Sequence, residues 1–309
     1  MKQKPTITIG IPAYNEEVNI YRLLTCLIHQ SENGIAIKQI IIINDGSGDH
    51  TALEIGKVHD ERILLINNAT RYGQIYCQNL IFSRANSDIV VLLEADTEPT
   101  NLNYLKTLIE PIKRDRTIGI IQGNILSLQP KTFVGKIIRE QESIYLRTTT
   151  RKKNLEEIFS SGRGGRAFSR GVYTKLRWPA HIPEDTYAAL WCMRRKIPIK
   201  VQKQAVCVFR TPENISDFRR ARQKIITGRS ALEKYFSVKE IHSLYNRSNK
   251  ETLMMFIEFI FTKPIYCIFY FFLKGYAEIV GFNRNFSDHW EIGKSTKFVL
   301  EKKYHSFTL

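Results

Sequence analysis

The chain has 309 residues, of which 43% are hydrophobic and 25% charged, so it can bury a sizeable core in one large or two smaller domains. Its formal net charge of +16 indicates anionic partners: phosphates, nucleic acid or an acidic membrane surface. The five cysteines are scattered, with no Cys-x-x-Cys pair, which excludes a disulfide framework or zinc-ribbon class and favours reduced thiols in a cytoplasmic setting. The first residues lead directly into a predicted strand, so we expect no signal peptide.

The first third of the chain alternates between short apolar runs and one-sided helical patterns. The apolar runs predict strands over residues 6–11, 39–44, 62–67, 89–93 and 118–122. Spacings of three and four residues between apolar positions predict helices over residues 15–28, 51–58, 74–85 and 102–114. Strands alternating with helices indicate an α/β fold, Rossmann-like, with a mostly parallel sheet flanked by helices.

Four polar breaks follow four of these strands. In a parallel sheet, ligands bind in the crevice beyond the carboxyl ends of the strands. The breaks therefore fall on the same edge of the sheet, at residues 12–16, 45–49, 68–73 and 94–97. Their convergence favours a ligand site over ordinary surface loops.

Two carboxylates follow the strand predicted over residues 89–93. Glu94 and Asp96 are spaced i, i+2, which on an extended strand directs both side chains to one side, and Pro99 ends the strand ladder just beyond them. Divalent cations such as Mn²⁺ or Mg²⁺ prefer oxygen ligands, so a cation site is one interpretation. The alternative is that both acids are polar turn residues at the end of a strand.

Several common nucleotide motifs are missing from this sequence. The turn after the first strand lacks Gly-x-Gly-x-x-Gly, which a dinucleotide site requires, and there is no Walker-type Gly-x-x-x-x-Gly-Lys. A phosphatase of the Asp-x-Asp-x-Thr type is the closest rival, because residues 94–97 imitate its spacing. That chemistry needs a nucleophilic aspartate where Glu94 stands, and usually on the first strand, so we disfavour it.

Over residues 7–228 the chain resembles the GT-A-fold glycosyltransferases of family 2. The resemblance depends on four motifs in order: Ile11-Pro12-Ala13-Tyr14-Asn15-Glu16, Asn44-Asp45-Gly46-Ser47 with Asp49 and Thr51, Glu94-Ala95-Asp96-Thr97-Glu98-Pro99, and Glu184-Asp185. It implies an inverting transferase that moves a sugar, most simply from a UDP-sugar, to a hydroxyl of a glycan or lipid-linked acceptor.

The resemblance also implies roles for individual residues of the donor site. Asp45 would accept a hydrogen bond from the base, Glu94 would lie beside the ribose, and Asp96 would reach a Mn²⁺ or Mg²⁺ ion that bridges the diphosphate. The full nucleotide-sugar set is Pro12, Ala13, Tyr14, Glu16, Asp45, Ser47, Gly73, Glu94, Ala95, Asp96, Arg222 and Lys224. Two positions depart from the family: Glu94 replaces the usual first aspartate, and Gly73 is followed by Gln74 in place of lysine.

The middle of the chain holds the predicted acceptor side. The glycine-rich stretch of residues 160–168 can allow a substrate to approach the backbone, but it can equally be a linker or tight turn. By resemblance, Gly164, Gly165 and Glu184 would contact the acceptor and Asp185 would be the general base. A sugar hydroxyl is a poor nucleophile, so a positioned carboxylate that takes its proton is worth roughly 10²–10⁴-fold in rate. Without the resemblance, acids in a first helical turn are simply favourable caps.

A basic helix follows over residues 217–229. Such a charge run is commonly a solvated face or a nucleic-acid footprint. Processive members of the family carry Gln-Arg-x-Arg-Trp here, and the matching positions are Ala221, Arg222, Gln223, Lys224 and Ile225. The two cations are kept and predict pyrophosphate contacts, whereas the loss of the tryptophan argues against a processive synthase.

The last third is rich in Phe, Ile and Tyr. Residues 253–273 are interrupted by Glu258 and by Lys263-Pro264, and the remaining run over 264–273 is half of the roughly 20 residues that span a bilayer. We therefore expect two amphipathic segments at a membrane surface, with Lys274 and Arg284 near anionic lipid; the alternative is ordinary packed core helices.

Two hypotheses follow for the whole chain. The first is a glycosyltransferase with a catalytic domain over residues 1–235 (donor half 1–125, acceptor half 126–235) and a helical region over 236–309 that we expect to associate with a membrane. It would lie on the cytoplasmic face of the membrane and bind no nucleic acid. The second is a non-enzymatic nucleic-acid or anionic-surface binder, supported only by the net charge and the basic helix.

Overall fold

The computed structural model describes residues 4–149, 164–245, 249–279 and 294–297. Its strands are β1 Thr6–Ala13, β2 Ala36–Asp45, β3 Ile63–Asn68, β4 Ile89–Leu92, β5 Glu98–Pro99, β6 Ile120–Ser127, β7 Arg166–Ser169 and β8 Ile199–Phe209. Its helices are α1 Ile20–Ile28, α2 Thr51–Gly56, α3 Gln74–Arg84, α4 Tyr104–Arg114, α5 Phe133–Thr149, α7 Arg170–Tyr173, α8 Glu184–Arg194, α9 Ile215–Leu232, α10 Val238–Tyr245, α11 Asn249–Thr262, α12 Pro264–Ile279 and the short η1 Lys294–Thr296.

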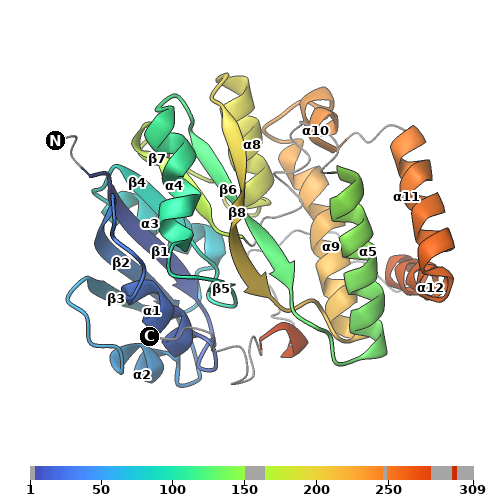
Figure 1. The fold of residues 1–309 in the computed structure, drawn as a ribbon, viewed down its shortest axis with the longest axis horizontal. Helices are drawn as coiled ribbons and strands as arrows, with labels where there is room; N and C mark the ends of the chain where they lie inside the picture. Colours follow the sequence, from blue (N-terminus) through green and yellow to red (C-terminus); the bar gives the residue numbers. More distant parts are fainter. Residues whose placement is uncertain (1–3, 150–163, 246–248, 280–293, 298–309) are drawn as a thin grey trace.

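The strands form one sheet in the order β3-β2-β1-β4-β7-β6-β8-β5 (Figure 1). The first four are parallel to one another, and β6 is parallel to β8. β7 lies antiparallel between β4 and β6 and joins the two parallel groups. The predicted α/β class, with a mostly parallel sheet flanked by helices, is confirmed.

The four consecutive isoleucines of β2 show why this sheet needs helices on both faces. Ile40 and Ile42 pack into one core with α1 and α4, while Ile41 and Ile43 pack into a second core with α3. Successive side chains of a strand point to opposite faces, so an uninterrupted apolar run is stable only when both faces are covered. Both faces of β2 are covered in this way.

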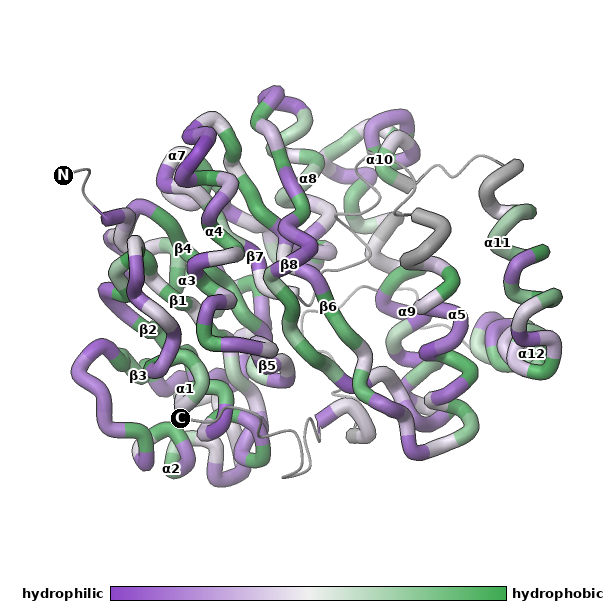
Figure 2. The backbone as a smooth tube through the Cα atoms, in the orientation of Figure 1, coloured by the Kyte–Doolittle hydropathy of each residue, from purple (hydrophilic) through white to green (hydrophobic). Residues whose placement is uncertain are grey.

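A helical layer covers the far end of the sheet. Ile137 and Ile138 of α5 pack with Phe218 of α9 and Leu273 of α12, and this contact joins the C-terminal helices to the rest (Figure 1). Pro264 begins α12, as expected from the interruption in the sequence. Figure 2 shows hydrophobic residues recurring along α11 and α12 at the border of the molecule. Within the described ranges, no helix combines the length and the apolar character needed to cross a bilayer.

Two local details differ from the sequence expectation. Glu94 and Asp96 follow β4 as predicted, but β4 ends at Leu92 and the two acids lie in a turn, so the same-side geometry of an extended strand does not apply to them. Thr97 holds this turn, because its backbone N–H and its hydroxyl both donate to the Glu94 carbonyl, at 3.2 and 2.8 Å. Pro99 does not end a ladder: it pairs with Cys207 of β8 in the two-residue edge strand β5.

Candidate active site at the carboxyl edge of the sheet

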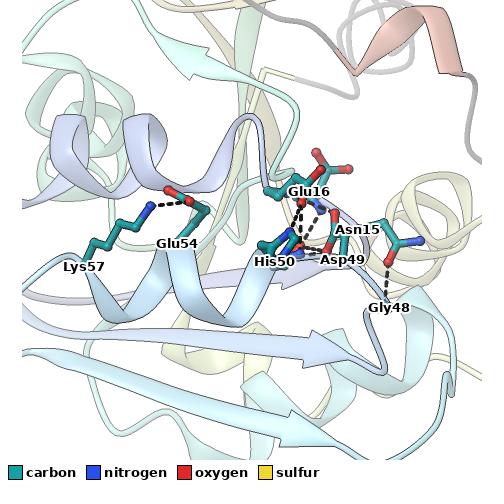
Figure 3. Close-up of polar contacts among 9 residues, drawn as sticks. Asn15, Glu16, Gly48, Asp49, His50, Glu54 and Lys57 are labelled. Atoms are coloured by element: carbon teal, nitrogen blue, oxygen red, sulfur yellow. Dashed lines mark hydrogen bonds and ion pairs between the residues drawn. The ribbon is translucent and has the colours of Figure 1, made fainter.

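The loops after β1 and β2 are bonded to each other at the carboxyl edge (Figure 3). The Asn15 N–H donates to Ser47 Oγ at 2.9 Å, and the Gly48 N–H donates to Asn15 Oδ1 at 2.8 Å. The Glu16 N–H donates to Thr51 Oγ1 at 2.7 Å. Asn15 adopts φ 53°, a left-handed conformation that Asn tolerates better than most residues. The sequence-predicted residues Ala13, Tyr14, Glu16 and Ser47 are thus brought together.

Asp45 is almost completely buried and shapes the third loop. Its carboxylate accepts from Asn68 Nδ2 at 2.8 Å, from the Tyr72 N–H at 2.9 Å and from the Gly73 N–H at 2.7 Å. If Asp45 also accepts a hydrogen bond from a nucleotide base, as predicted, it would use lone pairs of its carboxylate that these three bonds leave available. Gly46 must be a glycine, because it has φ +68° and an added Cβ would lie 2.6 Å from the Thr70 carbonyl carbon.

Aromatic and cationic groups stand beside the first loop. The Arg71 guanidinium lies 3.9 Å from the centroid of the Tyr14 ring, a cation–π contact. Tyr72 and Tyr76 stack nearby, with ring centroids 4.6 Å apart. Sequence reasoning missed Arg71, although its position in the third polar break was a usable signal. Flat aromatic surfaces beside buried acceptors can hold a planar base.

Glu16 is the most strongly perturbed acid of this edge. Glu16 is 7% exposed. Its burial, and to a lesser extent repulsion from Asp96, raises the pKa of its carboxyl to about 8. Lys297 counteracts this shift from the C-terminal end: its Nζ lies 3.8 Å from Glu16 Oε1 and donates to the Tyr14 carbonyl at 3.3 Å and to the Asn15 carbonyl. Sequence reasoning missed Lys297, which no local pattern connects to the first loop.

Asp96 is the acid that the sequence predicts to reach a Mn²⁺ or Mg²⁺ ion. Among the described residues no cluster of three or more His, Cys, Asp or Glu side chains could enclose a metal. Mg²⁺-type sites commonly use one or two carboxylates, with substrate phosphates and water completing the shell. A cation bound there would relieve the electrostatic repulsion between Asp96 and Glu16. The residues present therefore fit a Mn²⁺ or Mg²⁺ ion shared with a diphosphate.

In metal-free buffer, Glu16→Gln should stabilise the chain more at pH 8 than at pH 5. A carboxyl whose pKa is raised by folding contributes stability below its ordinary pKa near 4.5, and this is lost as the pH rises to about 8. Glutamine keeps the shape and cannot ionise. Urea unfolding with EDTA at both pH values measures the difference. Glu17→Gln is the control, because the pKa of Glu17 is lowered and it should show no gain toward pH 8. An equal effect of Glu16→Gln at both pH values would contradict the prediction.

The glycines of the predicted acceptor side are required by packing. Gly165 has φ +75°, and a Cβ there would lie 2.2 Å from the Tyr104 hydroxyl oxygen. The same hydroxyl donates to the Gly164 carbonyl at 2.6 Å, and a Cβ on Gly123 would meet that carbonyl oxygen at 1.9 Å. Residues 160–163 of the glycine-rich stretch lie outside the described residues. Contact of Gly164 and Gly165 with an acceptor stays a prediction.

Glu184 and Asp185 open α8 and face different surroundings. Glu184 is buried and pairs with Arg166, with Nη2 and Oε1 3.4 Å apart. Asp185 is partly exposed; its Oδ1 accepts from the Thr186 N–H at 2.6 Å, and its side chain lines a small hollow with Arg166 and Gln122. Adjacent helical residues point about 100° apart, so only one of the two acids can address a given hydroxyl.

Arg222 and Lys224 lie on α9. The Arg222 Nη2 donates to Glu278 Oε1 of α12 at 2.9 Å, so the guanidinium is held by the C-terminal helices. The pyrophosphate role of Arg222, like that of Lys224, stays a prediction. Arg284 lies outside the described residues.

Solved structures with the same fold come from sugar transferases. A mannosyltransferase from Pyrobaculum calidifontis, in complex with GDP-Man and Mn²⁺, superposes with a TM-score of 0.56 and 16% identity, covering 91% of this chain and 77% of that one. Glucosyl-3-phosphoglycerate synthase from Mycobacterium tuberculosis, with Mn²⁺, UDP and glucosyl-3-phosphoglycerate, gives 0.53 and 16%, covering 74% and 79%. At this identity the likeness establishes the fold: this is a GT-A glycosyltransferase architecture.

The sequence comparison identifies the family. Residues 8–177, more than half of the chain, match Glycosyl transferase family 2, and the chain belongs to that family. It is 25% identical over 224 residues to poly-beta-1,6-N-acetyl-D-glucosamine synthase of Staphylococcus aureus, covering 68% of this chain and 51% of that protein. It is 28% identical over 163 residues to 4,4'-diaponeurosporenoate glycosyltransferase of Staphylococcus haemolyticus, covering 52% and 41%. The chain thus spans about half the length of the curated relatives it matches. The predicted resemblance and the assignment as a glycosyltransferase enzyme are confirmed.

Proposed function

We propose that this chain transfers a sugar from a nucleotide-sugar donor, preferably a UDP-sugar, to a hydroxyl group of a glycan or lipid-linked acceptor, with inversion at the anomeric carbon. The observation that carries the proposal is the meeting of the loops after β1, β2 and β3 at the same sheet edge as the Asp96 turn and the start of α8. The family supplies the class of reaction. The residue roles below are part of the proposal.

The donor half of the site would hold the nucleoside. The Tyr14 ring with Arg71 across it, and the nearby Tyr72 and Tyr76, offer flat apolar surfaces for a base. Asp45 offers a buried acceptor beside them. Asp96, whose negative charge repels that of Glu16, would hold Mn²⁺ or Mg²⁺ together with the diphosphate. When bound, that ion supplies positive charge that stabilises the departing nucleoside diphosphate.

Asp185 would act as the general base. Its carboxylate takes the proton of the acceptor hydroxyl while that oxygen forms a bond to the anomeric carbon. The bond from the anomeric carbon to the donor phosphate oxygen breaks, and its electron pair leaves with the nucleoside diphosphate. A single displacement of this kind inverts the anomeric centre. Ile225 occupies the position of the family tryptophan that accompanies processive synthesis, which supports a non-processive transferase.

A donor panel tests this function. We expect UDP, or one of GDP, dTDP and CMP with their sugars, to raise the melting temperature only in the presence of Mn²⁺, since a ligand that binds only the folded state stabilises it. Purified protein is heated with each compound, with and without Mn²⁺. The control is adenosine monophosphate with Mn²⁺. A melting temperature unaffected by every nucleotide and nucleotide sugar would contradict the proposal.

The proposal includes attachment to a membrane surface through α11 and α12. Both helices carry large apolar side chains that are exposed, among them Phe261 at 82% and Phe272 at 71%. The remainder of this apolar surface consists of Leu253, Met254, Phe256, Ile257, Ile260, Ile265, Ile268, Phe269, Phe271, Tyr276 and Ile279. So many exposed apolar side chains on two adjacent helices fit the lipid interface, with the net positive charge favouring anionic headgroups. The buried free cysteines support a reducing compartment, hence the cytoplasmic face.

Full-length protein should sediment with vesicles of anionic phospholipid, and the double substitution Phe261→Ser and Phe272→Ser should release it. The two rings are the most exposed Phe side chains of α11 and α12, and serine removes their apolar area without disturbing the buried contacts. Leu53→Ser, at a 65% exposed leucine of α2, is the matched control. Part of the vesicle binding should be lost at high salt, because salt screens the attraction between the positively charged protein and the anionic lipid. Protein that stays in the supernatant at low salt would favour the packed-helix alternative.

A further inference from the structure

Two buried polar side chains lie beside the donor half of the site with atoms that no neighbour satisfies. Arg166 is 5% exposed and Gln78 is 2% exposed. Within the described part of the chain, Arg166 Nη1 and Gln78 Oε1 have no hydrogen-bond partner. Buried polar groups are nearly always bonded, so a donor and an acceptor left together indicate a bound group that pairs with both.

The two side chains line the same small hollow. Glu94 and Gly165 complete its polar wall, and the hollow has room for about one hydroxyl-sized group. Arg166 begins β7 and pairs there with Leu92, the last residue of β4, so the hollow that both residues line lies at the carboxyl edge. Arg166 also lines the second hollow, that of Asp185. Arg166 therefore lines both the hollow of Glu94, a predicted donor contact, and the hollow of Asp185, the predicted base.

The charges around the hollow favour a neutral group. Glu184 already pairs with Arg166, at 3.4 Å, and Glu94 adds a second carboxylate to the wall. A carboxylate ligand would satisfy Arg166 Nη1 but would face both acids, and it has no proton to give Gln78. A hydroxyl can accept from Arg166 Nη1 and donate to Gln78 Oε1 at the same time.

We propose that Arg166 and Gln78 bind one hydroxyl of the sugar to be transferred and so select the donor. This inference rests on the proposed function, since it assigns the sugar part of the same donor. Glu184 then serves as a positioning residue that holds the Arg166 side chain in place. Sugars with an axial, missing or oxidised group at that position bind less well, because a site built to bond a hydroxyl is left with unpaired atoms when the hydroxyl is lost.

Gln78→Met is the sharpest test, because it removes the acceptor at similar size and leaves the Arg166–Glu184 pair intact. Affinities for UDP, UDP-Glc, UDP-Gal, UDP-GlcNAc, UDP-glucuronic acid, GDP and GDP-Man are measured by calorimetry with Mn²⁺. For the sugar nucleotide that wild type prefers, we expect a loss of roughly three- to tenfold, with the free nucleoside diphosphate unaffected. Gln204→Met, the same change at an exposed position of β8, should leave all affinities unchanged.

Arg166→Lys gives the second arm, since it keeps a positive charge for Glu184 but lacks the forked donors. It should weaken the same sugar nucleotide, and the double variant with Gln78→Met should lose little more than the larger single loss, because both side chains hold one hydroxyl. Equal losses for the nucleotide and the sugar nucleotide, or no loss, would overturn the inference while leaving the proposed function standing. Tight, Arg166-dependent binding of UDP-glucuronic acid would overturn the assignment of a hydroxyl. A wild-type protein that binds no nucleotide of the panel would overturn both proposals.

Discussion

Asp185→Asn should lower the transfer rate by roughly a hundredfold or more while leaving donor and metal affinity nearly unchanged. The amide keeps the shape of the side chain and can still accept from the Thr186 N–H, so α8 keeps its first-turn bond. What it loses is the capacity to take a proton from the acceptor hydroxyl. Single-turnover transfer and calorimetric donor titration measure the two quantities separately.

The control for Asp185→Asn is Glu54→Gln. Glu54 is also an acid in a first helical turn, that of α2, so this change removes a comparable interaction with the helix dipole. If Asp185 were only a favourable helix-start charge, both variants would affect stability slightly and the rate not at all. A wild-type rate in Asp185→Asn, or a collapse of donor binding, would show that the proposed base is a structural residue.

Asp96→Ala should abolish measurable transfer and the Mn²⁺-dependent part of donor binding, while the fold stays intact. The side chain lies in a turn held by Thr97, and no bond that stabilises the turn passes through its carboxylate among those described. Burial is the main cause of the raised pKa of Glu16 and repulsion from Asp96 the second, so removing Asp96 relieves part of the strain on Glu16 and unfolding in EDTA should be no easier than for wild type. Calorimetry with and without Mn²⁺ and a transfer assay at controlled free metal test these expectations.

Glu61→Ala is the matched control for Asp96→Ala, since it removes an exposed acid remote from the carboxyl edge. It should leave both transfer and metal dependence unchanged. Full activity of Asp96→Ala in chelator-controlled buffer would eliminate the metal role of this residue.

The alternation of strands and helices could be predicted because it depends on local periodicity. The four isoleucines of β2 are an apolar run that only a doubly covered strand explains, and the structure covers both faces. Pro264 correctly divided the C-terminal hydrophobic region into two helices. The turn after β4 could not be placed to the residue, because Leu93 continues the apolar pattern although the strand pairing ends at Leu92.

Only those residues of the candidate site that directly follow a predicted strand could be predicted from the sequence. Asp45, Glu94 and Asp96 follow predicted strands, so their shared edge could be expected, although their roles stay predictions. Arg166 stood in a glycine-rich stretch that gave no reason to expect a strand, and its pairing with Glu184 depends on how β7 meets α8. Nothing in the first polar break indicates that Lys297 will complete it.

The loop after β1 is synthesised long before Lys297, which contacts it in the folded chain. The Lys297 ammonium and the Tyr14 carbonyl that it bonds are separated by 283 positions in the chain. At about 5–20 residues per second, the ribosome adds Lys297 roughly 15–60 s after the loop has emerged in the growing chain. During that interval Glu16 lacks the cation that partly neutralises it in the folded chain. The contact that partly neutralises Glu16 is therefore absent from the growing chain until Lys297 has been added.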